Sequence, residues 1–334
     1  MLGPFERRSL ASRLITSGFV LLCAASLLAL FAPLGWPFEL FAHFRVQYAA
    51  AAAAGALILL WQRQPGYAAA ALLLAAWHGI PVGQRALAGD RAQCHGPSFT
   101  VASVNVRFIN ERTAPVLEWL GAQDVDLVVV QEVTGPWAAA LGELHGFPHR
   151  AFFPRPDAYG IGVLSRRPVD ALELIDFAGD GLPSLSGVVE VEGRPVRFLG
   201  LHTRWPVLSA LAQARDQALA EVARIVTDES RPTVVLGDLN LTPDSPAFGR
   251  LLEDGGLRDA VVGPGWRPTW RAGFWPLALR IDHVLVSDGL CAVEAIVGES
   301  IGSDHRPVLA RLQLTTAADP APQAAVARDR LAAR

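Results

Sequence analysis

The stretch Thr233 to Thr242, T-V-V-L-G-D-L-N-L-T, decides the fold. The Thr, Val and Leu residues before Gly237 predict a buried strand, because β-branched and aliphatic side chains fit a sheet covered on both faces. Asp238 and Asn240 stand two residues apart, so on extended chain both side chains point the same way. A carboxylate and an amide at a strand end are typical of a site for a metal, a water and a phosphate. A strand that runs into an Asx turn would have the same sequence.

Apolar residues are concentrated before about residue 83, although 51% of the whole chain is hydrophobic. Leu14 to Ala32 is 19 residues without a charge, enough to cross a bilayer core about 30 Å thick at about 1.5 Å per residue. Val46 to Trp61 and Gly66 to Val82 are also uncharged but shorter, and they predict two further spans or a buried helical hairpin. Trp residues near the segment ends favour spans, so residues 1–83 predict a transmembrane segment of three helices.

The arginines predict the orientation of these spans. Arg7, Arg8 and Arg13 precede the first span, and positive residues tend to stay cytoplasmic. Three crossings then place everything after about Gly83 outside the cytoplasm, whereas two crossings would place it on the cytoplasmic side. A cleaved signal peptide is an alternative for the first segment, but further apolar segments follow it. We therefore expect a multi-pass protein in the lipid bilayer, with an extracytoplasmic large domain.

The rest of the chain divides into three parts. Residues 84–97 mix Gly, Pro and charge and predict a linker, residues 98–314 are ample for one hydrophobic core, and residues 315–334 predict a disordered tail. Cys94 and Cys291 are the only cysteines outside the membrane segment. A disulfide between them is compatible with an extracytoplasmic domain, but two cysteines do not make a framework, so we interpret them as inert thiols.

Strand-like and helix-like segments alternate in the large domain. The hairpin-like connection Glu192 to Pro195 argues against an all-parallel sheet, and Gly160-Ile161-Gly162 lacks the third glycine of a dinucleotide-binding loop. We expect an α/β architecture with two mixed sheets. The predicted strands are Phe99–Val106, Asp126–Val133, Gly160–Ser165, Gly187–Val191, Val196–His202, Thr233–Leu236, Ile281–Val286 and Pro307–Leu314, and the predicted helices are Ala114–Ala122, Trp137–Leu144, Val207–Val226 and Ala247–Leu252.

Polar side chains interrupt these apolar strands, mostly where the strands end. An unpaired carboxylate in a sheet core is costly, so Glu132 requires a cation or a donor. Taken singly, each polar residue has a structural explanation as a cap, a surface ion pair or a satisfied core histidine. Taken together they predict a site, because α/β sites assemble at strand ends. The residues are Asn105, Glu132, His202, Asp238, Asn240, Asp282, Asp304 and His305.

The motifs around these residues resemble the endonuclease/exonuclease/phosphatase superfamily with the DNase I-like fold. They appear in that family's order from Phe99 to Leu312. The resemblance implies a four-layered α/β sandwich, two mixed β-sheets flanked by helices, and Mg²⁺-dependent cleavage of a phosphate ester, with Mn²⁺ as an alternative metal. The matching stretches are S-V-N-V-R with Asn105, V-V-Q-E with Glu132, G-I-G-V-L-S-R at Gly160 to Arg166, L-H-T with His202, G-D-L-N with Asp238 and Asn240, R-I-D-H-V with Asp282, and S-D-H-R-P-V with Asp304 and His305.

The resemblance also implies a metal site. Glu132, helped by Asn105 and Asp304, would hold the cation through oxygen, as Mg²⁺ prefers. The metal would polarise the phosphoryl oxygens and stabilise the leaving oxyanion. Asp304 and His305 are adjacent and would face opposite ways on a strand, so we expect a loop there.

The remaining residues receive acid–base roles from the same resemblance. His305 would pair with Asp282, which fixes its tautomer and stabilises its protonated form. His202 would contact the phosphate or protonate the leaving group. Asp238 would orient or activate the attacking water, and Asn240 would hydrogen-bond a phosphate oxygen.

Several other residues stay outside this assignment. His283 stands where relatives often carry an aromatic residue, and we interpret it as structural. Tyr159 lies one residue from the register of a phosphate-binding tyrosine in some relatives, so we give it little weight. Five aromatic residues fit a substrate-facing patch or the core equally well: Trp205, Trp266, Trp270, Phe274 and Trp275.

The substrate is left open by the sequence. Residues 98–314 hold 19 Arg against 27 Asp and Glu, a net charge of −8. A domain that grips nucleic acid normally has a basic surface, so this balance disfavours that class of substrate without excluding it. The alternatives are a membrane-anchored nuclease or phosphodiesterase, a sphingomyelinase-type or phospholipid-type phosphodiesterase, and an inactive binding module on the same fold. The intact set of site residues favours an enzyme.

Overall fold

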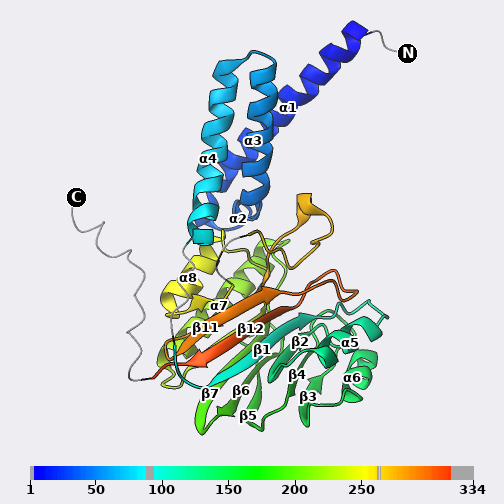
Figure 1. Ribbon diagram of the computed structural model, residues 1–334, viewed down its shortest axis with the longest axis vertical. Coiled ribbons are helices and arrows are strands. Elements are labelled where there is room, and N and C mark those ends of the chain that lie inside the picture. The colour runs from blue at the N-terminus through cyan, green and yellow to red at the C-terminus, as the bar shows by residue number, and fades with distance from the viewer. Residues whose placement is uncertain (1–3, 88–93, 262, 264, 317–334) are drawn as a thin grey trace, which may run out of the picture.

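The chain folds into a layered sandwich that carries a bundle of helices at one end (Figure 1). The computed structural model describes residues 4–87, 94–261, 263 and 265–316, with side chains from Ser17 on. The strands are β1 Ser98–Asn105, β2 Leu127–Gln131, β3 His149–Phe153, β4 Ile161–Ser165, β5 Val169–Ile175, β6 Ser184–Val191, β7 Arg194–His202, β8 Thr233–Asp238, β9 Arg258–Asp259, β10 Asp282–Val286, β11 Leu290–Val297 and β12 Val308–Leu314.

These strands form two six-stranded mixed sheets, with the orders β11-β12-β1-β2-β4-β3 and β5-β6-β7-β8-β10-β9. One apolar core fills the space between the sheets, with residues such as Val129 and Leu236 fully buried. Two further cores lie under the helices α5 Ala114–Ala122 and α6 Gly135–Gly142 on one outer face, and under α7 Ser209–Asp228 and α8 Pro246–Asp254 on the other. The predicted four-layered α/β sandwich is therefore confirmed.

Strand directions bring the polar ends together at one edge of the sandwich. β1 runs parallel to β2, and β7 runs parallel to β8, so the carboxyl ends of each pair lie side by side. β10 is antiparallel to β8, and β12 is antiparallel to β1, so each begins at the edge where its neighbour ends. The sheets pack face to face, and Asn105, His202, Asp238 and Asp282 consequently meet at one place.

The interior strands agree with the sequence prediction, whereas β3, β5, β9 and β11 were not predicted. All four are edge strands of the two sheets. An edge strand has one unpaired side, and β5 is half-exposed along its length. Such strands lack the continuous apolar run that marks a strand buried on both faces.

The N-terminal region is helical, with α1 Pro4–Leu30, the turn η1 Ala32–Leu34, α2 Glu39–Ala42, α3 Arg45–Trp61 and α4 Pro65–Leu87. Of the described helices, α4 is long and apolar enough to cross a membrane by length and composition, and only 17% of its most apolar stretch is buried. Ser17–Leu30 and Arg45–Trp61 are apolar but shorter. α4 continues to Leu87, beyond the start of the predicted linker, while residues 88–93 of that linker and 317–334 of the predicted tail lie outside the described residues.

The helical region docks on the sandwich through buried polar contacts. Glu39 of α2 accepts hydrogen bonds from Nη2 of the fully buried Arg215, at 2.5 Å, and from the Ser245 hydroxyl. His43 Nδ1 lies 3.0 Å from the Thr242 hydroxyl. Asp244 pairs with Arg45 of α3 and with Arg85 of α4, at 3.4 and 2.6 Å. Three of these partners follow β8 directly, so the helices stand on the same edge where the polar strand ends converge.

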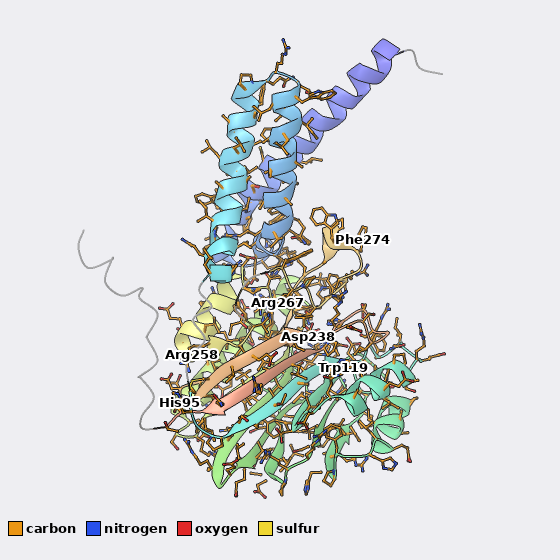
Figure 2. All side chains as sticks on the ribbon, viewed as in Figure 1. His95, Trp119, Asp238, Arg258, Arg267 and Phe274 are labelled. Carbon is orange, nitrogen blue, oxygen red and sulfur yellow. A yellow bond between two sulfur atoms is a disulfide. The ribbon has the colours of Figure 1, made fainter. Side chains whose placement is uncertain are left out.

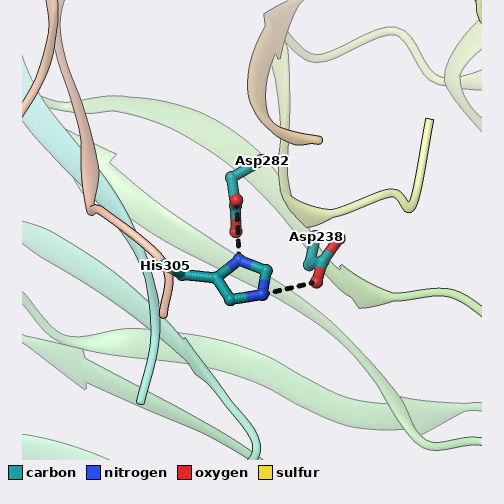
Figure 3. Close-up of side chains that lie close together, drawn as sticks. All are labelled: Asp238, Asp282 and His305. Atoms are coloured by element: carbon teal, nitrogen blue, oxygen red, sulfur yellow. Dashed lines mark hydrogen bonds and ion pairs between the residues drawn. The ribbon is translucent and has the colours of Figure 1, made fainter. Parts of the chain in front are cut away.

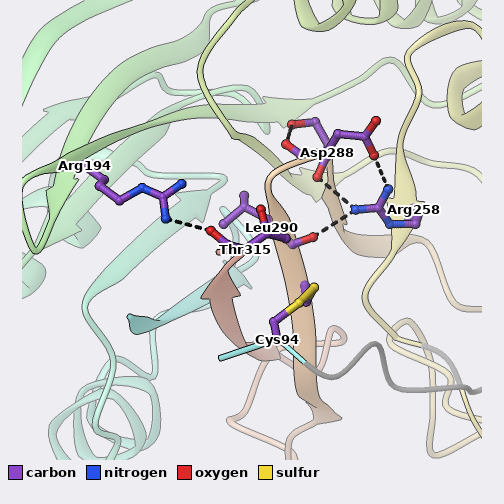
Figure 4. The surroundings of a disulfide bond; sticks show 8 residues. Cys94, Arg194, Arg258, Asp288, Leu290 and Thr315 are labelled. Carbon is purple, nitrogen blue, oxygen red and sulfur yellow. Dashed lines mark hydrogen bonds and ion pairs between the residues drawn. A yellow bond between two sulfur atoms is a disulfide. The ribbon is translucent and has the colours of Figure 1, made fainter. Parts of the chain in front are cut away.

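A disulfide joins Cys94 to Cys291 of β11, so our interpretation of inert thiols is wrong (Figure 4). Their Cα atoms are 6.2 Å apart, within the ordinary range for a disulfide. The sequence allows this bond, but it does not show that two cysteines 197 residues apart lie side by side. Nearby, Arg258 of β9 donates to the Leu290 carbonyl at 2.9 Å, and Arg194 of β7 donates to the Thr315 carbonyl at 2.8 Å. The disulfide therefore fixes the start of the sandwich to one of its edge strands.

Candidate functional site

Asp238 contacts the other polar side chains at this edge; Figure 2 labels its position in the sandwich, and Figure 3 shows it beside His305. Its Oδ2 lies 3.2 Å from Nδ2 of Asn105, 3.6 Å from Nε2 of His202 and 3.8 Å from Nε2 of His305. Gly237 precedes it with φ at 148°, and a Cβ there would lie 1.9 Å from the Leu201 carbonyl oxygen. Only glycine permits this close approach of β8 to β7. The glycine of the G-D-L-N motif thus sets His202 beside Asp238.

His305 and Asp282 form a buried pair on the other side of Asp238. Nδ1 of His305 lies 2.9 Å from Oδ2 of Asp282 (Figure 3). His305 precedes β12 in a short irregular segment, as expected from the need to turn it away from Asp304. The second carboxylate oxygen of Asp282 is buried and has no hydrogen-bond partner among the described residues. Asp282 is therefore aimed at the imidazole.

Burial and neighbouring charges shift two pKa values in this cluster. Burial and the charge of Asp282 together raise the pKa of Asp238 to about 6, against the opposing effect of the two histidines. Burial alone would lower the pKa of His305, but the charge and hydrogen bond of Asp282 outweigh it and raise that pKa to about 10. At neutral pH His305 is consequently an imidazolium, and it lies between Asp238 and Asp282.

Asn105 links this cluster to Glu132. The Asn105 amide donates to Glu132 Oε1 at 3.0 Å as well as to Asp238, and Glu132 Oε2 accepts from the Phe108 backbone N–H at 2.8 Å. Glu132 is 9% exposed, and none of the ion pairs found among the described residues includes it. Its φ of 64° is left-handed, which is costly for a residue with a side chain. A buried carboxylate held by neutral donors alone is suited to a cation.

Asp304 lies at the margin of this arrangement. Its carboxylate lies 3.5 Å from Arg107 Nε and accepts from the Trp270 indole at 3.3 Å. The side chain of Asp304 is 26% exposed, so this carboxylate is more open to solvent than Asp238 or Glu132. The structure brings Asp304 beside the cluster and gives it a cation and an indole as partners.

Asn240 is close to Asp238 but turned toward the backbone. Its N–H donates to Asp238 Oδ1 at 2.9 Å, and its side-chain amide donates to the Thr203 carbonyl at 2.9 Å. Like Glu132, it has a left-handed backbone, with φ at 49°. In this conformation, these two hydrogen bonds of Asn240 hold Asp238 close to the segment after His202.

Two residues that our sequence analysis left aside lie at the site. The Tyr159 ring is 5.3 Å from the His202 ring, and the Arg204 guanidinium lies 4.7 Å above the Tyr159 ring. The one-residue difference in register does not keep Tyr159 away from the site, because a loop between β3 and β4 carries it and a loop need not keep strand register. Trp270 contacts Asp304 through its indole. His283 is buried against Phe248 and bonded to the Leu241 carbonyl at 2.8 Å, in keeping with its structural interpretation.

Fold and site together define a DNase I-like sandwich with an acid–histidine centre at one edge. Residues 102–305 match the model of the Endonuclease/Exonuclease/phosphatase family, so the chain belongs to this family of phosphoester hydrolases. No curated protein matches the chain in sequence.

Solved structures share the fold at low sequence identity. An endonuclease/exonuclease/phosphatase from Beutenbergia cavernae is 21% identical, with a TM-score of 0.54 over 66% of this chain and 72% of its own. A 3′ phosphatase from Neisseria, bound to a product DNA hairpin, is 23% identical, with a TM-score of 0.52 over 64% and 98%. Sphingomyelinase C from Streptomyces griseocarneus is 19% identical, with a TM-score of 0.50 over 64% and 99%.

Proposed function

We propose that the protein is a membrane-anchored, Mg²⁺-dependent hydrolase that cleaves a phosphodiester by in-line attack of a water. The observation that carries the proposal is the position of Asp238, within 3.8 Å of both site histidines and with a pKa of about 6. A carboxylate with this pKa is ionised at pH 7 and is still basic enough to accept a proton from water. Asp238 would therefore orient and deprotonate the attacking water.

The histidines would handle the charge that develops on the phosphate. His305, kept protonated by Asp282, would donate a hydrogen bond to a phosphoryl oxygen. His202 lies on the other side of Asp238, and its Nδ1 is buried with no partner among the described residues. His202 would donate a proton to the leaving oxygen. Asn240 would add a hydrogen bond to the phosphate if its amide leaves the Thr203 carbonyl.

The metal would be held by Glu132 and Asn105, with Asp304 as a third oxygen ligand. Asp238, Asp282 and His305 also offer ligand atoms within 4.8 Å of one another, but they compensate one another's charge. Within the described part of the chain Glu132 has neutral donors only, and its oxygen chemistry fits Mg²⁺ better than a set with an imidazole does. When bound, Mg²⁺ would polarise the phosphoryl oxygens and neutralise the leaving oxyanion.

The helical region would anchor the enzyme in a bilayer. α4 is long enough to span, and α1 and α3 expose large apolar side chains such as Leu21 and Leu57, which a soluble surface does not favour. We propose three spans within residues 1–83, followed by a catalytic domain over residues 98–314. The disulfide favours an oxidising compartment, which agrees with the extracytoplasmic side that the N-terminal arginines predict.

The test is turnover by the full chain purified in detergent. The substrates are bis(p-nitrophenyl) phosphate, duplex DNA, RNA and sphingomyelin, each with Mg²⁺, with Mn²⁺ and with EDTA. We expect metal-dependent turnover that falls about 10²- to 10⁴-fold in His305→Ala and is unchanged in His145→Ala, a control on an exposed histidine. No turnover on any substrate, turnover in EDTA, or an unaltered rate in His305→Ala would refute the proposal. A reporter fused after Leu314 that is active only in the cytoplasm would refute the orientation.

A further inference from the structure

Three loops that border the site carry exposed large apolar side chains. Ile109 follows Asn105, Trp205 and Leu208 follow His202, and the loop before β10 carries Phe274 and Trp275. Among the described residues from Cys94 on, the exposed large apolar side chains lie on these loops, apart from Leu174 and Ile296. A soluble domain would spread such residues singly over its surface. Their restriction to the edge that holds the site requires a cause.

The loop before β10 connects the site to the base of the helical bundle. At its base, Trp270 and Arg271 contact Asp304, through the indole at 3.3 Å and the backbone N–H at 2.9 Å. Near its tip, the carbonyls of Trp275 and Ala278 accept hydrogen bonds from Nε2 of Gln47, at 3.3 and 2.8 Å. Gln47 lies in the first turn of α3. Figure 2 shows Phe274 on this loop beside the base of the bundle.

We propose that Ile109, Trp205, Leu208, Phe274 and Trp275 form an apolar rim that rests in the head-group layer of the bilayer crossed by the helices. This inference rests on the membrane anchor of the proposed function. The site would then open onto the membrane surface, and its substrate would be a phosphoester whose phosphate lies in the head-group layer of a lipid.

The level of the rim relative to the helices supports a bilayer as the occupant. Arg45 and Arg85 pair with Asp244 and mark the polar ends of α3 and α4 at the sandwich. The Gln47 contacts hold the loop before β10 at the level of the first turn of α3, where a spanning helix would enter the membrane. Phe274 and Trp275 are 56% and 49% exposed there. Trp is favoured at this depth because its indole joins an apolar ring to a polar N–H, and the apolar ring of Phe can be buried at the boundary of head groups and acyl chains.

Charges around the rim fit the same surface. Arg271 is exposed at the base of the loop before β10 and lies 4.9 Å above the Trp270 ring, and Arg204 and Arg107 border His202 and Asp304. Arg204 pairs with Asp180 at 2.6 Å and Arg107 with Asp304 at 3.5 Å, whereas no ion pair found among the described residues includes Arg271. Basic residues close to a membrane attract anionic head groups. Because the helices already hold the domain at the bilayer, a weak contact at the rim suffices to orient it.

The contact is tested by a measurement that does not depend on activity. Phe274→Cys and, as a matched exposed control, Leu174→Cys are placed in a Cys23→Ala background, labelled with an environment-sensitive dye and reconstituted as full chain in phosphatidylcholine–phosphatidylglycerol vesicles. We expect the dye at position 274 to be quenched at least about twofold more by spin-labelled lipids than the dye at position 174, and to be shielded from iodide. Equal quenching at the two positions would overturn the proposal. Free access of iodide to position 274 would also overturn it, because that result is expected if the rim binds a soluble protein instead of lipid.

The consequence for substrate is tested with Phe274→Ser/Trp275→Ser. We expect turnover of a phospholipid or sphingomyelin in vesicles to fall about tenfold or more, while turnover of soluble bis(p-nitrophenyl) phosphate stays within about twofold. Leu174→Ser should alter neither rate. An equal loss on both substrates, or turnover of the soluble diester without any of lipid by the unaltered protein, would overturn the lipid substrate. An enzyme inactive on every substrate refutes the proposed function instead, and the labelling experiment still decides whether the rim touches lipid.

Discussion

Replacing Glu39 by Gln should weaken the attachment of the helical region to the sandwich. Glu39 is 3% exposed, and its carboxylate pairs with the fully buried Arg215 across the interface between the helical region and the sandwich. Removing one partner of a buried ion pair costs about 3–5 kcal/mol, because the other charge is left uncompensated. Asp216 still accepts from Arg215 at 2.7 Å, so we expect the lower end of that range, about 3 kcal/mol.

The assay is urea unfolding of the full chain in detergent micelles, followed by tryptophan fluorescence, for Glu39→Gln, Arg215→Met and the double variant. The double variant should be less destabilised than the sum of the single variants, because it leaves no unpaired charge. Glu221→Gln is the control, since Glu221 pairs with Arg224 on the exposed surface of α7 and should contribute no measurable stability. A midpoint of Glu39→Gln equal to that of Glu221→Gln, or strict additivity in the double variant, would refute the reasoning.

Three further predictions concern Asp238, the disulfide and His43. Asp238→Asn should lower kcat about 10²- to 10⁴-fold with unchanged circular dichroism, and a rate within twofold of the unaltered enzyme would exclude Asp238 as the base. Cys94→Ser should lower the free energy of unfolding by roughly 2–5 kcal/mol, because the bond closes a long loop; dithiothreitol should reproduce the loss in the unaltered protein and add nothing to the variant. Burial, followed by the charge of Arg215, lowers the pKa of His43 from 6.5 to about 3. As the pH falls below 6.5, the imidazole is protonated in the unfolded chain before it is protonated in the folded protein. The folded protein therefore loses stability between pH 6.5 and pH 3. At pH 5 this loss is roughly 2 kcal/mol, and His43→Gln should remove it; an identical pH dependence in both proteins would contradict the assignment.

The sequence was most informative where burial was most complete. β8 was predicted because every one of its residues is buried and its sequence is therefore mostly apolar. β5 was not predicted because it is an exposed edge strand. The site residues were predictable because carboxylates, amides and histidines interrupt apolar strands, and parallel neighbours end at a common edge. The whole candidate set lies together there, with Asp304 at its margin and Asn240 turned to the backbone.

Contacts between distant parts of the chain could not be predicted from local pattern. Glu39 and Arg215 are 176 residues apart, and neither stands in a motif. Tyr159 contacts His202 from a loop, and the alternation of apolar and polar residues does not predict where a loop side chain lies. A high content of Ala and Leu predicted helices before residue 83, but the polar residues that dock these helices on the sandwich stand in no recognisable motif. Their function appears only when the fold brings them to the edge that holds the site.

The bond between Cys94 and Cys291 makes a covalent ring of the chain between them. The three loops that border the site all lie within this ring, since they fall between residues 105 and 282. A protease that cuts any one of them would leave both fragments linked to each other and, through the chain before Cys94, to the helices. Shedding of the intact domain from a membrane would therefore require a cut on the N-terminal side of Cys94. Nicked enzyme would migrate as one band without reductant and as two bands with it.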